Sequence, residues 1–239
     1  MPGKIYMIPV TLGGSSYSEV IPDYVTSITK KLRFFIVEDL RSARRFLKTL
    51  DKEFPINDCS FLEMNEHTAD RNLAEFLDPV LEGNDAGIMS EAGMPGIADP
   101  GAQLIARAHL KNIKVVPLVG PSSIILALAA SGLNGQNFTF NGYLPVKQTE
   151  RAAKIRELER RSASGSSQIF METPYRNQRL LEAVVQICSD HTMLCVAADL
   201  TLQSETIRTL PISEWKKNMP DLTDRLVIFV LEHNIRGSF

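Results

Sequence analysis

Residues 86–100, AGIMSEAGMPGIADP, constrain the fold more than any other part of the chain. The segment begins with a short apolar run typical of a buried strand, and continues as a glycine- and proline-rich loop whose only charges are Glu91 and Asp99. The next residues show helical spacing. A strand that leads through such a loop into a helix is where an open α/β sheet binds a ligand. Gly93 and Gly96 let the backbone approach a ligand closely, so the segment predicts either a pocket wall or an ordinary surface turn.

Short strand candidates alternate with amphipathic helices through the first half of the chain, and this alternation predicts a largely parallel sheet covered by helices. Within it, residues 53–65 have mixed character, and residues 69–81 predict a helix that Pro79 breaks near its end. Later, turn-rich connections predict a mixed sheet. We therefore expect an α/β protein of two α/β lobes, with a mostly parallel sheet in residues 1–118 and a mixed sheet in residues 119–239.

The composition excludes several classes of function. The 239 residues are 44% hydrophobic and 23% charged, which is ordinary for a soluble globular protein. No apolar run approaches the roughly 18 residues of a membrane span, and no signal-peptide pattern opens the chain, so we expect a cytoplasmic protein. Cys59, Cys188 and Cys195 are odd in number and lack metal-ligand spacing, which favours core thiols.

Familiar ligand motifs are missing as well. Four scattered histidines and the lack of an HExxH motif argue against a metal site. The sequence also lacks the GxxxxGK[ST] and GxGxxG phosphate-binding loops. The ligand, if there is one, must be held by other means.

The net charge of -2 argues against indiscriminate nucleic-acid binding, but seven basic residues gather in residues 30–48. Arg41, Arg44, Arg45 and Lys48 fall on one face of a predicted helix. Such a row is either a solvated face or a surface that follows phosphates.

Five motifs occur in a fixed order: SEAGMPGIADPG, VPLVGPSS, ASGL, FNGYLP and METPYR, which begin at residues 90, 116, 130, 140 and 171. In this order they resemble the tetrapyrrole methylase family, and within it the branch that methylates a ribose 2′-oxygen of small-subunit ribosomal RNA. The resemblance spans nearly the whole chain. It implies two α/β lobes with S-adenosyl-L-methionine in the cleft between them, and a homodimer.

The resemblance also implies the cofactor-binding positions, which lie on three loops and at two strand ends. Their contacts in the family are largely made by backbone and small residues, which agrees with the glycine-rich loops seen here. The positions are Pro9, Gly13, Glu91, Ala92, Gly93, Met94, Pro95, Pro121, Ser122, Ser123, Met171, Glu172, Ala197 and Ala198.

Positions expected to face the substrate depart from the pattern of this branch. Residues 10–13 are VTLG where the branch has TPIG, and residues 62–66 are LEMNE where it has HEHNE. Residues 198–202 are ADLTL where it has RELTK, and Tyr175 replaces a histidine. The chain therefore resembles a divergent member that keeps the cofactor motifs.

Methyl transfer from a sulfonium needs an aligned acceptor, and a ribose hydroxyl is a poor nucleophile that benefits from a base. The candidate catalytic residues are Glu91, Asp99 and Glu66. Glu91 and Asp99 could equally cap a helix or bind loop amides.

Three hypotheses remain open at this point. The first is methylation of RNA, with phosphates held by basic residues of both halves of the chain: Arg41, Arg44, Arg45, Lys48, Lys147, Arg151 and Lys154. Arg176 is a further expected substrate contact. The second is methylation of a small molecule such as a tetrapyrrole. The third is a protein that binds the methyl donor without catalysis. We expect the first, with ribosomal RNA as the substrate.

Overall fold

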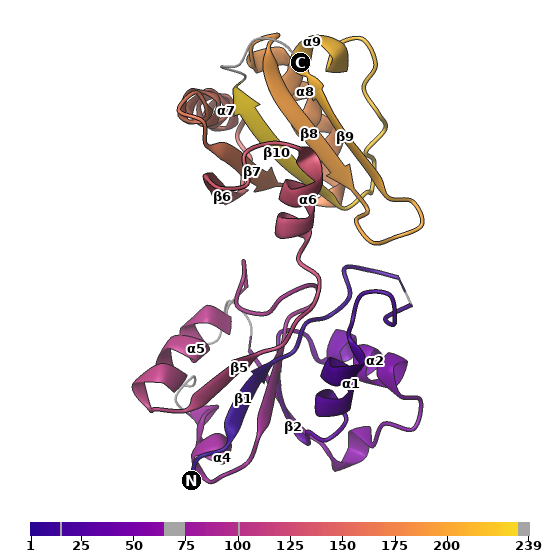
Figure 1. Cartoon of the computed structure of the whole chain (residues 1–239), viewed down its shortest axis with the longest axis vertical. Helices are drawn as coiled ribbons and strands as arrows, with labels where there is room; N and C mark the ends of the chain where they lie inside the picture. The colour runs from indigo at the N-terminus through magenta and orange to yellow at the C-terminus, as the bar shows by residue number, and fades with distance from the viewer. Residues whose placement is uncertain (15, 65–74, 100, 234–239) are drawn as a thin grey trace. The chain divides into compact units, whose positions relative to one another are not determined.

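The computed structural model describes residues 1–14, 16–64, 75–99 and 101–233. The chain divides into two compact units, Met1–Ser122 (unit 1) and Ser123–Phe239 (unit 2), and each is an α/β structure (Figure 1). The boundary expected after residue 118 lies in the segment between β5 (Lys114–Pro117) and α6 (Ser123–Ser131). The predicted fold class, a parallel first sheet and a mixed second sheet, is confirmed.

Unit 1 contains a five-stranded sheet of order β3-β2-β4-β1-β5, in which every adjacent pair is parallel. All five strands therefore end at the same side, which we call the carboxyl edge of unit 1. Its strands are β1 (Lys4–Met7), β2 (Phe34–Val37), β3 (Ser60–Glu63), β4 (Ala86–Met89) and β5 (Lys114–Pro117).

Helices cover both faces of this sheet, as the alternation of the side chains of β2 shows. Phe35 and Val37 pack in one apolar cluster with residues of α1 and α2, and Phe34 and Ile36 pack in another with residues of α4 and α5. All four are buried, as expected for a strand covered on both faces. The helices of unit 1 are α1 (Asp23–Thr29), α2 (Leu40–Leu50), the 3-10 turn η1 (Ile56–Asp58), α4 (Asp78–Leu81) and α5 (Gly101–Leu110).

Two segments of unit 1 differ from expectation. The mixed region 53–65 contains strand β3, which has only two partly buried residues at its centre and pairs with β2 alone, so its apolar signal is weak. Of the helix expected over residues 69–81, residues 69–74 lie outside the described part of the chain. Pro79 lies in the first turn of α4 and not near the end of a longer helix, because a first turn needs no N–H group there.

Unit 2 contains a mixed five-stranded sheet of order β6-β7-β10-β8-β9. Strands β6 and β7 are parallel, and β10 is antiparallel to both β7 and β8, so β6, β7 and β8 run in the same direction. The strands are β6 (Phe138–Tyr143), β7 (Ser167–Met171), β8 (Thr192–Ala198), β9 (Thr206–Pro211) and β10 (Val227–His233).

Two long helices pack on one face of this second sheet. Ile155 of α7 and Val184 of α8 belong to the same core as Phe170 and Phe229, whose rings stack at 5.5 Å. Helix α6 lies on the opposite face, where the Thr209 hydroxyl donates to its last residue. The helices not yet given are α7 (Gln148–Ser162), the 3-10 turn η2 (Pro174–Arg176), α8 (Asn177–Ile187) and α9 (Ile212–Trp215).

The three cysteines are free thiols. Cys188 and Cys195 are buried as expected, and burial raises the pKa of Cys188 to about 12, so it carries no thiolate at neutral pH. Cys59 is only partly buried. Within the described residues, no helix is long and apolar enough to span a membrane.

Candidate functional site

The loops after β1 and β4 join at the carboxyl edge of unit 1. The Val10 amide donates to the Gly93 carbonyl at 2.9 Å, and the Gly93 amide donates back to the Val10 carbonyl at 3.0 Å. Gly93 adopts a φ of 73°, a left-handed conformation that glycine accepts without strain. Two of the loops expected to bind the cofactor therefore form one connected backbone surface.

The loop after β5 packs against the same surface. The Leu118 amide donates to the Met7 carbonyl at 3.1 Å, which continues the β1–β5 pairing beyond the strands. A Cβ atom placed on Gly120 would lie 2.2 Å from Cβ of Pro9, so only glycine fits this approach. The Pro121 carbonyl oxygen would lie 3.6 Å from a Cβ on Gly93. The structure thus brings together Pro9, Gly93 and Pro121 from the three predicted loops.

The other predicted positions on these loops lie on the same connected segments. Ala92 is exposed, Pro95 is buried and Met94 is partly buried. Gly13 follows the bridge residue in the first loop, and Ser122 ends unit 1. They are therefore close in the chain to the bridge or to Pro121, and small or apolar side chains predominate among them.

A partly buried carboxylate, Glu38, lies at this edge and was not singled out by the sequence analysis. It directly follows β2, and its Oε2 accepts a hydrogen bond from the Glu91 amide at 3.1 Å. Burial raises the pKa of Glu38, the hydrogen bond from Glu91 opposes that rise, and the negative charges of Asp99 and Glu91 add to it. The available signal was an acidic residue immediately after a fully apolar strand.

The three candidate bases differ sharply in their surroundings. Both carboxylate oxygens of Asp99 accept from the Gly96 amide at 2.8 Å, and Oδ1 also accepts from the Gly101 amide at 2.7 Å. Burial raises the pKa of Asp99, and the hydrogen bonds from these amides partly oppose that rise. Asp99 therefore holds its own loop closed. The Glu91 side chain is exposed and has no hydrogen-bond partner among the described residues, and Glu66 lies outside them.

In unit 2 the predicted positions gather where β7 and β8 end, which we call the β7–β8 edge. Met171 and Ala197 both pair with Ile228 on the intervening strand β10, so they lie in one row across the sheet. Ala198 pairs with Val227 in the next row and is fully buried, as is Ala197. Ser123 is the first residue of α6.

Glu172 is the charged residue of this edge. Its Oε1 accepts from the Thr173 amide and from Nη2 of Arg176, each at 2.7 Å. The side chain is 1% exposed, and its Oε2 is buried with no partner among the residues that the structure describes. A buried acceptor without a donor is unusual and marks a place where a ligand could donate a hydrogen bond. Arg176, a predicted substrate contact, is held by Glu172 and by the Thr173 hydroxyl at 3.0 Å.

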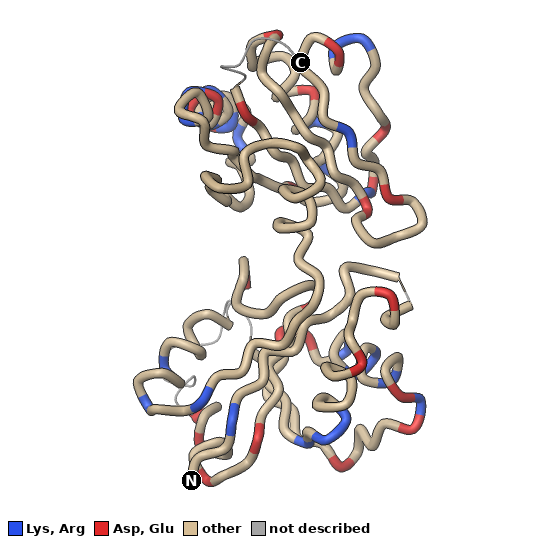
Figure 2. Tube along the Cα trace, in the orientation of Figure 1, with Lys and Arg blue, Asp and Glu red and all other residues tan. Residues whose placement is uncertain are grey.

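The predicted basic row lies on α2 of unit 1, where Figure 2 colours its residues blue along the chain trace. Its members are exposed. The Arg44 guanidinium lies 5.3 Å from the centre of the Phe61 ring, and Lys48 donates to the Lys52 carbonyl at 2.8 Å. Asp39 caps the helix by accepting from the Ser42 amide, which lowers the pKa of Asp39. Because α2 begins directly after β2 ends, its first turn lies at the carboxyl edge of unit 1. Of the other predicted substrate contacts, Arg151 lies on α7 in unit 2.

Comparison with known proteins identifies the family. The sequence model described as "Tetrapyrrole (Corrin/Porphyrin) Methylases" matches residues 26–216. The chain belongs to this family. As a tetrapyrrole methylase it is a methyltransferase, and the enzyme class predicted from the motifs is confirmed.

Curated relatives support the same assignment over most of the chain. A protein named ribosomal RNA small subunit methyltransferase I from Vibrio cholerae is 30% identical over 210 residues, which cover 88% of this chain and 69% of the relative. Proteins of the same name from Streptococcus pyogenes and Escherichia coli O157:H7 are 31% and 28% identical, and the matches cover 89% and 96% of this chain. They cover 70% and 78% of those relatives.

A solved structure shares the fold of this methylase. The crystal structure of the methyltransferase CobJ matches with a TM-score of 0.63 and 15% sequence identity, over 97% of this chain and 95% of that one. At this identity the match supports the fold alone. The two-lobed fold expected from the motifs is therefore found in a known methyltransferase.

Proposed function

We propose that this tetrapyrrole methylase transfers a methyl group from S-adenosyl-L-methionine to RNA, with ribosomal RNA as the physiological substrate. The observation that carries the donor assignment is the joining of three loops at the carboxyl edge of unit 1, through the Val10–Gly93 bridge and the packing of Gly120 on Pro9. The RNA assignment is supported by the names of the curated relatives, whose similarity extends through both units.

The residues present suit a donor of this chemistry. Gly93 and Gly120 let the three loops pack closely on one another, which leaves a surface made largely of backbone and small residues. The buried, unpartnered Oε2 of Glu172 can accept a hydrogen bond from a ligand amine. The residues proposed to hold the donor are those predicted from the motifs, and Glu91 belongs to that set through its backbone and not its side chain. When bound, the donor supplies a methyl group on a positively charged sulfur.

The chain's own residues would position the acceptor and receive its proton. We assign Glu91 as the base, because its carboxylate is exposed and has no competing partner among the described residues. Glu38 is a positioning residue that fixes the Glu91 backbone through the hydrogen bond at 3.1 Å. Asp99 keeps the loop closed through Gly96 and Gly101. Glu66 remains an alternative base.

The basic face of α2 is proposed to hold RNA phosphates. Arg41 and Arg45 are exposed and have no ion pair among the described residues, so they are available to a polyanion. Arg44 retains its charge while it packs on Phe61. We also expect a cytoplasmic homodimer, and sedimentation of the purified protein would test the dimer.

The direct experiment incubates the protein with donor carrying a tritiated methyl group and with ribosomal subunits from a strain that lacks this protein. We expect label in small-subunit RNA, mapped to one nucleotide, and a loss of at least 100-fold in rate for Glu91→Gln with donor binding retained. Charge reversal at Arg44 and Arg45 should weaken RNA binding and leave donor binding unchanged.

Each other outcome contradicts the proposal in a distinct way. Label that enters a tetrapyrrole and no RNA would show a small-molecule methyltransferase. Donor binding by calorimetry, without transfer to any cellular RNA or extract, would show a non-catalytic protein.

A further inference from the structure

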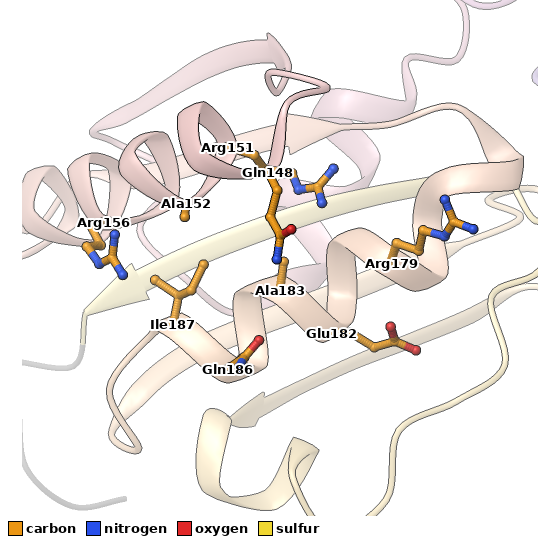
Figure 3. Close-up of a pocket in the computed structure, with 9 residues that line it drawn as sticks. All are labelled: Gln148, Arg151, Ala152, Arg156, Arg179, Glu182, Ala183, Gln186 and Ile187. Carbon is orange, nitrogen blue, oxygen red and sulfur yellow. The ribbon is translucent and has the colours of Figure 1, made fainter.

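Helices α7 and α8 of unit 2 enclose a groove between them, which we call the α7–α8 groove (Figure 3). Its cavity volume is about 720 Å³, and nine residues of the two helices line it. The charged ones are Arg151 and Arg156 from α7, and Arg179 and Glu182 from α8. Three arginines against one glutamate leave the groove positively charged.

The arginines of this groove form few hydrogen bonds and ion pairs with the described residues of the protein. Arg156 and Arg179 are exposed and form no hydrogen bond or ion pair with any residue in the described ranges. Arg151 donates from Nη1 to the Val146 carbonyl at 3.3 Å, and its Nε is buried without a partner in the same part of the chain. Within the described residues, the Arg151 guanidinium has a buried N–H group without an acceptor, and it lies beside the two unpaired guanidinium groups of Arg156 and Arg179. This arrangement favours an anionic ligand.

The remaining lining combines amides with an apolar floor. Figure 3 shows Gln148 pointing from α7 toward Ala183 on α8, and Gln186 lies toward the Arg156 end. Ala152, Ala183 and Ile187 supply the apolar surface. Amides can bind the edges of a base, an apolar floor can contact its face, and guanidinium groups can bind its phosphates.

The arginines are spread along the groove. Arg151 and Arg156 are five residues apart on α7, which corresponds to about 7.5 Å along the helix axis. Arg179 lies on α8 at the Arg151 end of the groove (Figure 3). Cations distributed in this way favour a chain of phosphates over a single phosphate. The groove volume of about 720 Å³ is that of a pocket for a small ligand, so the groove suits a short single-stranded segment and not a duplex.

We propose that the α7–α8 groove binds a single-stranded segment of the RNA substrate at a site separate from the residues of methyl transfer. The proposal rests on the proposed function, because it takes RNA as the acceptor. Arg156, Arg179, Gln148 and Gln186 then act in substrate recognition, a role that the family motifs do not give them. Glu182 accepts from Gln178 at 3.4 Å and repels phosphate, so it directs the backbone toward the arginines.

The test measures fluorescence anisotropy of a labelled single-stranded RNA of about 12 nucleotides with the full-length protein, without methyl donor. For Arg156→Gln combined with Arg179→Gln we expect binding at least tenfold weaker at low salt. The slope of log affinity against log salt should become shallower by about 1.4, since each lost phosphate contact in single strands contributes about 0.7. Arg160→Gln is the matched control, because Arg160 is exposed on α7 but does not line the groove, and its binding should fall far less.

A second variant separates the groove from general electrostatics. Ala183→Trp fills the groove and keeps every charge, so RNA binding should weaken while the thermal midpoint stays close to that of the wild type. Wild-type affinity in both the glutamine pair and Ala183→Trp would overturn the proposal. Equal binding of a matched RNA duplex would also overturn it, as would tight binding of adenosine monophosphate that single-stranded RNA does not displace. A change in sedimentation without a change in RNA binding would show instead a contact between copies of the chain.

The experiments distinguish a failure of the groove proposal from a failure of the proposed methyltransferase activity. If the wild type methylates RNA but the groove variants bind RNA normally, the groove proposal fails alone. If the variants lose RNA binding but the wild type transfers no methyl group to RNA, the proposed activity fails and the groove remains an RNA site.

Discussion

The two sheet edges that carry the predicted cofactor positions are built in different ways. At the carboxyl edge of unit 1, the loops are joined by backbone hydrogen bonds between Val10 and Gly93 and by the close approach of Gly120 to Pro9. At the β7–β8 edge of unit 2, side-chain ion pairs close the turns, with Glu172 bound to Arg176 and Asp199 bound to Arg225, both at 2.7 Å.

Because one edge is joined by backbone contacts and the other by side-chain ion pairs, the two edges should tolerate different substitutions. A backbone-built edge depends on residues without side chains, so added atoms should disrupt it. An edge closed by buried ion pairs depends on the match of two charges, so loss of one partner should disrupt it and loss of both should be tolerated. The predictions below test this contrast, beginning with the largest expected effect.

Gly120→Val should be the most damaging change, because even its Cβ would overlap Cβ of Pro9 at 2.2 Å. We expect a loss of about 3 kcal/mol or more in the free energy of unfolding, and donor binding at least tenfold weaker by calorimetry. Gly135→Val is the matched control, since nothing lies within 4 Å of a Cβ there and its φ is not positive. Equal effects of the two variants would contradict a backbone-built edge.

Arg176→Ala should cost about 2–3 kcal/mol in urea unfolding, because it leaves the buried Glu172 carboxylate without its cation. Adding Glu172→Gln to it should recover part of that loss, a coupling that a double-mutant cycle measures. If Arg176 instead serves only RNA, the single variant will lose RNA binding with no change in stability.

Asp99→Ala should cost about 1–2 kcal/mol in thermal or urea unfolding, because the amides of Gly96 and Gly101 lose their acceptor. The loop of unit 1 should then exchange its amide hydrogens faster. If Asp99 is the catalytic base instead, the variant will keep its stability and donor affinity and lose only the transfer rate.

Glu38→Gln should have the smallest effect, and that effect should depend on pH. Burial raises the folded-state pKa of Glu38 above its unfolded value, so the folded state binds the proton more tightly than the unfolded state. The wild type therefore loses stability as pH rises from the unfolded-state pKa to the folded-state pKa. Glutamine does not titrate, so the stability of the variant relative to the wild type should increase as pH rises above about 4.5. Urea unfolding at several pH values tests this, and a difference that stays constant with pH would refute the assignment.

The same contrast explains what the sequence could predict. The joining of the unit 1 loops could be predicted, because their key residues are glycines and prolines in a fixed order after an apolar strand and their backbone role follows from their type. The ion pair between Arg176 and Glu172 could not be predicted, because the local sequence around an arginine in a polar turn is the same whether the arginine binds substrate or Glu172. Asp199 and Arg225 are far apart in the chain, and only the antiparallel pairing of β8 and β10 brings them together.

Strand β3 and Glu38 were missed for related reasons. β3 is a four-residue edge strand with two partly buried residues, so its apolar pattern is too short to distinguish from a loop. In the sequence, Glu38 is only an acidic residue that follows an apolar strand. Its place beside Glu91 depends on β2 lying next to β4 in the sheet, which is a matter of strand order and not of local pattern.

The most direct test of the central claim is hydrogen–deuterium exchange of the full-length protein with and without S-adenosyl-L-methionine. If the donor binds the joined loops of unit 1, protection should increase around Val10, Gly93 and Gly120. If Oε2 of Glu172 accepts a hydrogen bond from the donor, protection should increase around Glu172 as well. The rest of each sheet should change little. No increase of protection in the unit 1 loops, under conditions where calorimetry detects donor binding, would contradict the donor assignment.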